Sequence, residues 1–149
     1  MASQSDLPVS NYLLIMNLFL LSDDGDRRLL QTFDLSTARF NLLGHLAASE
    51  SLTAADLCQR LLCDKANVTR LLDGLEGDGL VKRTPDKADG RRTRVTLTAA
   101  GRRRWTEAHE AHQASIRDRF GRLSPEEASI LQQLLSRLEA DLKANLAAA

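Results

Sequence analysis

The sequence predicts a mainly α-helical protein with one small β-hairpin. Its composition is 43% hydrophobic but only 4% aromatic, and leucine and alanine dominate, which favours helices packed through aliphatic stripes. Apolar residues recur with helical spacing along most of the chain, whereas extended, strand-like patterns are confined to residues 80–83 and 93–97. A length of 149 residues suits one folding unit with some additional structure.

Two helices are predicted in the N-terminal part. The first runs from Val9 to about Phe33, and its apolar residues surround most of its surface. Such a helix needs cover on several sides, so a partner subunit is expected. Ser36 is predicted to cap a second helix that ends near Ser49, with Phe40 and Leu43 on one face.

A helix-turn-helix unit is predicted next. Thr53 and Asp56 form a weak capping box at the start of its first helix. Asp64 caps the second helix, whose apolar residues follow the i, i+3, i+4, i+7 spacing of a buried face. These inward residues are Val68, Leu71, Leu72 and Leu75. Two helices joined by so short a connection form a helix-turn-helix.

A two-stranded hairpin with a charged tip follows the second helix. Residues 80–83 and 93–97 have the extended patterns of strands, and residues 86–92 between them are polar and turn-forming. We call this hairpin the wing. A helix-turn-helix followed by a wing predicts a winged helix-turn-helix fold.

Two more helices are predicted at the C-terminal end. Thr98 caps a helix that runs to roughly Phe120, and residues 124–127 open the last helix with a serine cap, a proline and two glutamates. The last helix carries a long apolar stripe: Ile130, Leu131, Leu134, Leu135, Leu138 and Leu142. A stripe that extends almost to a chain end indicates packing against another chain. We therefore expect dimerisation helices in residues 1–35 and 101–149, and a winged helix-turn-helix domain in residues 36–100.

The charge of the chain is unevenly distributed. Lysine and arginine together number 20, as do aspartate and glutamate, so the formal net charge is zero. Residues 65–104, however, contain eleven basic and five acidic residues, which makes that segment +6 and the remainder −6. A local basic field can attract a phosphate backbone. A solvated face whose arginines pair with neighbouring acids explains the charge equally well.

Outward residues at the start of the second helix of the helix-turn-helix are suited to a DNA groove: Lys65, Ala66, Asn67, Thr69 and Arg70. Arginine can pair with guanine and asparagine with adenine, while alanine and threonine can contact a thymine methyl group. A merely solvated polar face is the alternative for this helix taken alone. The wing adds Arg91, Arg92 and Arg94, and arginine is attracted to narrow minor grooves. Asp89 is either the carboxylate that orients a wing guanidinium or a simple turn residue.

The order of these motifs resembles the MarR family. The strongest matches are residues 57–61, 64–76, 79–83, 89–92 and 95–101. The resemblance implies a winged-helix dimer that sets one helix of each subunit into successive major grooves. By that resemblance Lys65, Ala66, Asn67, Thr69 and Arg70 contact bases and backbone, Arg91 enters the minor groove, and Asp89 orients Arg91. One departure is Leu62, where the family often has glycine.

The sequence therefore predicts a DNA-binding transcription regulator, expected to be a repressor. It would bind a pseudo-palindromic double-stranded DNA operator as a homodimer, with half-sites about 10 base pairs apart. A small aromatic or amphipathic effector is expected, although no residue identifies its pocket. The alternative is a winged-helix adaptor that binds protein and lacks DNA affinity. No arrangement of catalytic residues or phosphate-binding loop indicates an enzyme, and no cofactor is expected.

The cysteine, histidine and tryptophan residues discussed next are interpreted chiefly as structural residues. Cys58 and Cys63 match no metal, redox or disulfide spacing, so they are interpreted as small packing residues in a reduced, cytoplasmic protein. His109 and His112 lack a third convergent ligand, and no metal site is predicted. Trp105 is expected to anchor the core or an interface, with a ligand-lining role as the alternative. No membrane association is expected, because residues 12–21 are half the ~20 needed to span a bilayer.

Overall fold

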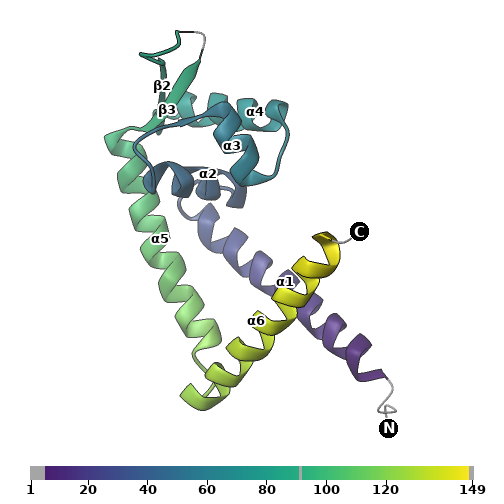
Figure 1. The fold of residues 1–149 in the computed structure, drawn as a ribbon. Helices are drawn as coiled ribbons and strands as arrows, with labels where there is room; N and C mark the ends of the chain where they lie inside the picture. Colours follow the sequence, from purple (N-terminus) through teal and green to yellow (C-terminus); the bar gives the residue numbers. More distant parts are fainter. Residues whose placement is uncertain (1–5, 91, 148–149) are drawn as a thin grey trace. The chain divides into compact units, whose positions relative to one another are not determined.

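The computed structural model describes residues 6–90 and 92–147, and these form a mainly helical winged helix-turn-helix fold (Figure 1). Its elements are, in order, α1 (Leu7–Gln31), α2 (Thr37–Ala47), β1 (Leu52–Thr53), α3 (Ala54–Leu61), α4 (Lys65–Gly77), β2 (Val81–Pro85), β3 (Thr93–Leu97), α5 (Ala99–Phe120) and α6 (Pro125–Ala147). The chain divides into two units after His112, so the second unit holds the end of α5 and α6. Among the described residues, none of the helices has the length and apolarity to cross a membrane.

Side-chain caps fix where the helices begin, and each cap predicted from the sequence is confirmed. In each cap, the side-chain oxygen accepts a hydrogen bond from the backbone amide three residues further along the chain, with 2.8–3.2 Å between oxygen and nitrogen. The capping residues are Ser36, Thr53, Asp64, Thr98 and Ser124. Each cap satisfies a backbone amide that the helix itself cannot, which is worth about 1 kcal/mol.

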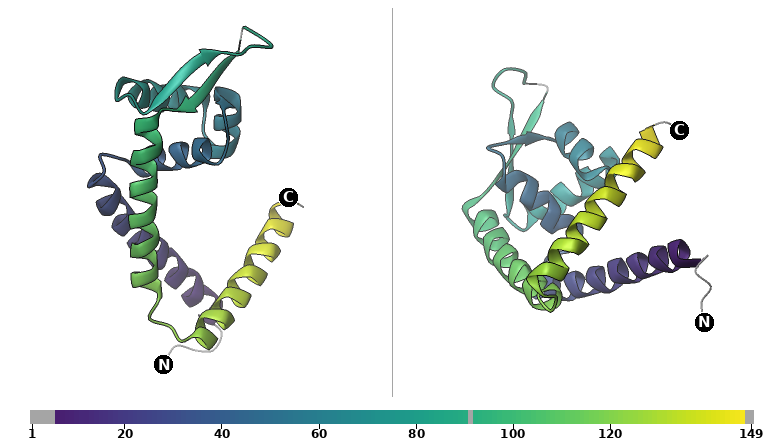
Figure 2. Two further views of the ribbon diagram at one scale, coloured as in Figure 1. Left: turned by 90° about the vertical axis from the view of Figure 1, so that its left-hand side faces the viewer. Right: turned by 60° about the horizontal axis from the view of Figure 1, so that its bottom comes forward.

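The sheet has three strands rather than the two predicted. β2 and β3 form the expected antiparallel hairpin, with Val81 opposite Leu97. The short strand β1 adds to the other side of β3, so that Leu52 lies opposite Val95 and the strand order is β1-β3-β2. A strand of two residues is too short to show alternation, which is why the sequence pattern missed it. Two further views show the β2–β3 hairpin extending away from the helices α2, α3 and α4 (Figure 2).

One hydrophobic core lies among α2, α3, α4 and the sheet and holds the winged unit together. Its most completely buried side chains are Leu30, Leu42, Leu43, Leu46, Leu57, Val68, Leu75 and Val95. Burying each such aliphatic side chain stabilises the fold by roughly 1.5–3 kcal/mol. Leu71, predicted to point inward, is only partly buried at the edge of this core. Because one face of α4 is buried in this core, its opposite face is exposed to solvent.

The turn between α3 and α4 contains a strained residue. Leu62 has φ 51° and ψ 40°, the left-handed conformation that glycine adopts without cost. Its side chain is 92% exposed, so no burial compensates for the strain. This geometry explains why glycine would suit position 62.

We expect Leu62→Gly to raise the free energy of unfolding by about 0.5–1 kcal/mol. Relief of the left-handed strain is worth about 1–2 kcal/mol, and the greater freedom of glycine in the unfolded chain offsets part of it. The midpoint of urea denaturation, at an unchanged slope, measures the gain. Leu62→Ala keeps the strain but removes the exposed side chain, and an equal gain in this control would refute the explanation.

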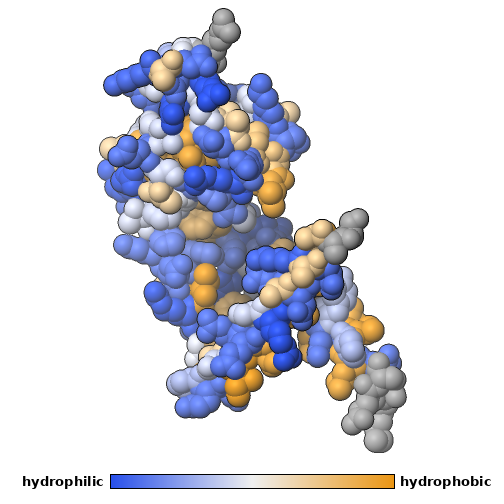
Figure 3. Space-filling view, viewed as in Figure 1, coloured by the Kyte–Doolittle hydropathy of each residue, from blue (hydrophilic) through white to orange (hydrophobic). Residues whose placement is uncertain are grey.

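The terminal helices leave most of their apolar residues exposed. α6 has no buried residue, and Leu30 is the sole buried residue of α1. Hydrophobic side chains accordingly lie at the surface over α1 and over α6 in the space-filling view (Figure 3). Exposed stripes of this length are unusual for a monomeric protein.

Candidate nucleic-acid interface

The exposed face of α4 carries all five residues predicted for its DNA-reading surface. Lys65, Ala66, Thr69 and Arg70 are exposed and Asn67 is partly exposed, whereas Val68, Leu72 and Leu75 on the opposite face are buried. All five lie in the first two turns, where the N-terminal part of a recognition helix approaches base edges. The structure thus brings these side chains together on one solvent-facing surface.

A hydrogen-bonded chain orders this surface. The Asn67 side-chain amide donates to Asp64 Oδ2 at 2.8 Å, and the Arg70 guanidinium donates to Asn67 Oδ1. The amide of Asn67 is therefore engaged at both ends. Arg70 is held by a neutral group, so its remaining N–H donors are available to an acceptor such as guanine.

Two other arginines serve the fold rather than the reading surface. Arg83 Nη2 lies 2.6 Å from Asp73 Oδ1, which links β2 to α4. Arg39 pairs with Asp78, just beyond the end of α4, and thereby links α2 to it. Acidic neighbours thus neutralise some of the arginines, as one explanation of the charge pattern predicted. The exposed basic residues of α4 fit the other explanation, attraction of a phosphate backbone.

Asp86 organises the start of the loop between β2 and β3, a segment for which the sequence predicted only a polar turn. Asp86 is 9% exposed, and its Oδ1 accepts the backbone amides of Ala88 at 2.7 Å and Asp89 at 3.2 Å. Its Oδ2 accepts Arg94 Nε at 2.5 Å. The spacing Asp86–Ala88 is that of an Asx turn, and this is the signal that could have identified it.

Arg94 therefore has a structural partner as well as its predicted role in DNA contact. Besides Asp86, it reaches Ser51 Oγ with Nη1 at 3.2 Å and so connects β3 with the segment before β1. Its side chain is still 44% exposed. The DNA contact of Arg94 remains a prediction.

At the wing tip, Asp89 lies beside Arg92, with 3.6 Å between Oδ2 and Nε. The backbone amide of Arg92 also donates to the carbonyl of Asp89 at 2.9 Å. Arg91, predicted to enter the minor groove with Asp89 as its orienting partner, lies outside the described residues. That pairing stays a prediction.

Acid is expected to loosen the wing through Asp86. The Arg94 guanidinium, with the amides of Ala88 and Asp89, lowers the pKa of Asp86 from 3.8 to about 2. Because folding lowers this pKa, the carboxylate stabilises the wing above pH 3.8, and that contribution is lost as the pH falls toward 2. The amide chemical shifts of Ala88 and Asp89 should titrate with a midpoint near pH 2. Asp86→Asn should remove this step, whereas a wild-type midpoint at 3.8 would contradict the arrangement.

The aromatic residues of α5 pack against α2. The Trp105 and His109 rings stack with centroids 4.6 Å apart, and the His109 ring lies 6.4 Å from that of Phe40. Trp105 packs partly buried against the core, as expected for a core anchor. Cys58 and Cys63 are free thiols, partly buried against the same core, in line with the packing interpretation. Within residues 6–90 and 92–147 no three or more metal-binding side chains gather into a group.

Comparisons with known proteins match this chain to one family model and to several transcriptional regulators. A model of the MarR family matches residues 33–92. The transcriptional regulator PecS of Dickeya dadantii is 31% identical over 146 residues, which cover 94% of this chain and 88% of PecS. The uncharacterised regulator YdgJ of Bacillus subtilis is 32% identical over 104 residues, 70% of this chain, and the match spans 63% of that protein's length.

Two solved structures of MarR from E. coli share the fold of this chain. Wild-type MarR from E. coli superposes with a TM-score of 0.75 at 26% identity, covering 84% of this chain and 93% of MarR. A cysteine-to-serine mutant of MarR in complex with operator DNA also superposes with a TM-score of 0.75, at 25% identity over 92% of this chain and 99% of MarR.

Proposed function

This chain belongs to the MarR family, and on that premise we propose that it is a transcription regulator that binds a pseudo-palindromic operator as a homodimer. The observation that carries the proposal is the exposed face of α4 beside the β2–β3 wing. A helix of this kind fits the major groove, and a wing arginine fits the adjacent minor groove. The resemblance to an operator-bound MarR structure supports this mode of binding.

The apolar faces of the terminal helices support the homodimer. A 23-residue helix with no buried residue, such as α6, gains little stability from its own chain, because most helices depend on packing of an apolar face. A second copy that covers α1 and α6 would provide that packing, with residues 1–35 and 101–149 as the dimerisation segments. Sedimentation at micromolar concentration should show a dimer, and a monomer would contradict the proposal.

We further propose that the protein is a cytoplasmic repressor whose DNA affinity changes when a small effector binds. An effector can shift the spacing of two recognition helices only by binding one arrangement more tightly than the other. The regulators among its relatives support a regulatory rather than an enzymatic role.

Binding to DNA at several salt concentrations tests the proposal. Each phosphate contact contributes a slope of about −0.9 in log affinity against log salt, so six to ten contacts lower affinity by about a thousandfold or more between 50 and 200 mM. Fluorescence anisotropy with a random duplex and with duplexes selected from a random pool would measure both slopes and the specificity ratio. No binding to any duplex in dilute buffer would refute DNA binding and favour the protein-binding adaptor.

A further inference from the structure

The acidic residues of α4 lie at its C-terminal end. Asp73 and Glu76 belong to the second half of the helix and Asp78 follows its last residue, whereas the basic residues Lys65 and Arg70 lie in the first half. Negative charge near the C-terminus of a helix opposes the helix dipole, which favours cations there. The end of α4 is therefore stable only if other elements supply positive charge to it.

Two arginines from other elements supply that charge. Arg83 of β2 lies 2.6 Å from Asp73 and 3.6 Å from Glu76, measured between guanidinium nitrogens and carboxylate oxygens. Arg39 of α2 donates a hydrogen bond to Asp78, the residue that caps the C-terminus of α4. The acidic end of α4 is thus attached to β2 by one arginine and to α2 by the other.

Gly74 leaves room for Arg39 at this end of the helix. A Cβ at position 74 would lie 3.3 Å from Arg39 Nη2 and 3.9 Å from its Cζ, so the guanidinium lies directly against the helix at this residue. Glycine inside a helix costs stability relative to alanine. The close approach of Arg39 accounts for that cost at position 74. It does not account for Gly77, where an added Cβ meets nothing within 4 Å.

The Arg39 side chain is shielded from solvent. It is 21% exposed, whereas Arg28, which pairs with an aspartate on α1, is 79% exposed. An exposed ion pair contributes little to stability, but a shielded guanidinium that loses its partner retains an unsatisfied charge. The contact between Arg39 and Asp78 is therefore more than an ordinary surface pair.

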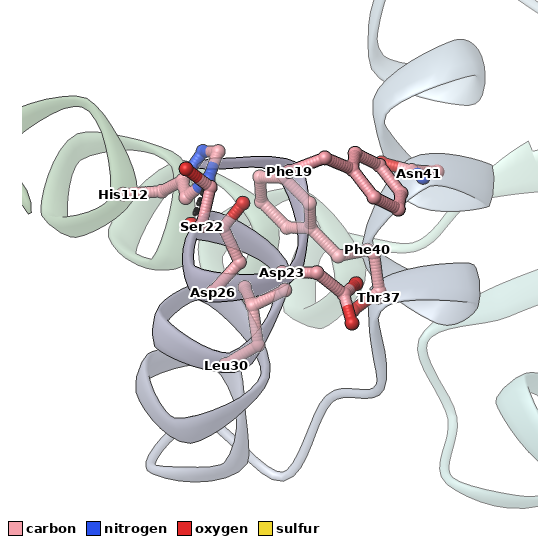
Figure 4. A pocket seen from close by; sticks show the side chains of 9 residues that line it. All are labelled: Phe19, Ser22, Asp23, Asp26, Leu30, Thr37, Phe40, Asn41 and His112. Atoms are coloured by element: carbon pink, nitrogen blue, oxygen red, sulfur yellow. Dashed lines mark ion pairs between the residues drawn. The ribbon is translucent and has the colours of Figure 1, made fainter. Parts of the chain in front are cut away.

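The helix α2 gives Arg39 a fixed base. Three other residues of α2, namely Thr37, Phe40 and Asn41, line a cavity whose remaining walls come from α1 and α5 (Figure 4). Arg39 instead reaches from α2 to α4. The core holds α4 by its apolar face, but apolar packing has no preferred direction, whereas a hydrogen bond has one. Arg39 thus restricts a rotation of α4 that core packing alone allows.

We propose that Arg39 is a positioning residue for the DNA-reading surface. It holds the end of α4 through Asp78 and against Gly74, and it thereby fixes the rotation of the helix about its own axis. That rotation determines the direction in which Asn67 and Arg70 approach base edges. The role of Arg39 in DNA recognition rests on the proposed function, and Arg39 itself contacts no base.

Fluorescence anisotropy with the selected operator and with random duplex tests the proposal. Arg39→Ala should weaken operator binding about tenfold, which is part of what complete loss of a forked base contact costs. Affinity for random duplex and its salt slope should stay at wild-type values, because phosphate attraction depends on charge rather than on side-chain direction. Arg28→Ala is the matched control, since it also removes an arginine that pairs with aspartate, and it should leave both affinities unchanged.

An exchange of charges separates the pair from the individual residues. Arg39→Glu alone should impair discrimination at least as strongly as Arg39→Ala, because two acids then face each other. Combining Arg39→Glu with Asp78→Arg restores an ion pair and should recover most of the discrimination. Circular dichroism at the assay temperature verifies that each variant is folded.

The free protein provides a second readout that needs no DNA. The backbone amide chemical shifts of residues 65–70 should change in Arg39→Ala and return toward wild-type values in the charge-exchanged variant, but not change in Arg28→Ala. These amides lie at the far end of α4 from Asp78, so loss of a purely local contact would not shift them.

Two results would overturn the assignment. If Arg39→Ala is less stable but keeps wild-type discrimination and wild-type amide shifts at residues 65–70, Arg39 only stabilises the fold. If it loses affinity equally for operator and random duplex, Arg39 is a phosphate contact rather than a positioning residue. Failure of the wild-type protein to bind any duplex would refute the proposed function instead, and the amide shifts would then decide whether Arg39 orients α4.

Discussion

Gly101→Ala is expected to lower the free energy of unfolding by about 3 kcal/mol or more. A Cβ at this position would lie 1.8 Å from the carbonyl oxygen of Leu80 and 2.8 Å from its carbonyl carbon. That oxygen also accepts the backbone amide of Thr98 at 3.1 Å, so it cannot move without breaking the junction between β2 and α5. Because the clash is with backbone, no side-chain rotation relieves it.

Gly77→Ala provides a matched control for this prediction. Gly77 is also helical, at the end of α4, and an added Cβ there meets nothing within 4 Å. Alanine favours a helix over glycine by up to about 1 kcal/mol, so this variant should be slightly more stable than wild type. Urea denaturation of both variants separates the effects. A similar small change in both would show that α5 does not approach Leu80 as closely as the structure places it.

The helices and the wing could be predicted because local chemistry determines them. Each capped helix begins with a side-chain hydrogen bond that spans only three residues, so the sequence indicates where the helix starts. The capping residues are Ser36, Thr53, Asp64, Thr98 and Ser124. The buried face of α4 follows from periodicity alone, and removing that face leaves the residues expected to read DNA. These signals lie within a short window of sequence and need no knowledge of the tertiary structure.

Features that depend on distant contacts could not be predicted in this way. β1 forms because Leu52 pairs with Val95 of β3, which lies more than forty residues further along the chain. Asp86 gains its role from Arg94, which comes beside it only when the hairpin closes. The pairing of Arg83 with Asp73 likewise needs β2 to lie against α4. Charge counts alone could not distinguish these paired arginines from those available to DNA.

Arg70→Ala is expected to weaken binding to the selected operator about a hundredfold, with a much smaller effect on random duplex. A forked arginine contact to a guanine is worth about 1–3 kcal/mol, and the proposed homodimer would present Arg70 twice. Arg91→Ala should lower affinity for all duplexes with a milder loss of discrimination, because a minor-groove arginine responds chiefly to groove width and charge. Anisotropy titrations of both variants on operator and random duplex would measure the two effects.

Arg70→Lys separates the geometry of this contact from its charge. Lysine keeps the positive charge but lacks the planar fork that pairs with a base edge, so non-specific affinity and its salt slope should stay at wild-type values while discrimination falls. Arg28→Ala is the control for loss of one charge elsewhere, because Arg28 lies on α1 with its side chain 79% exposed. If Arg70→Lys discriminates as well as wild type, Arg70 acts only as a phosphate contact. In that case the sequence must be read by the other exposed residues of α4 or by the shape of the DNA.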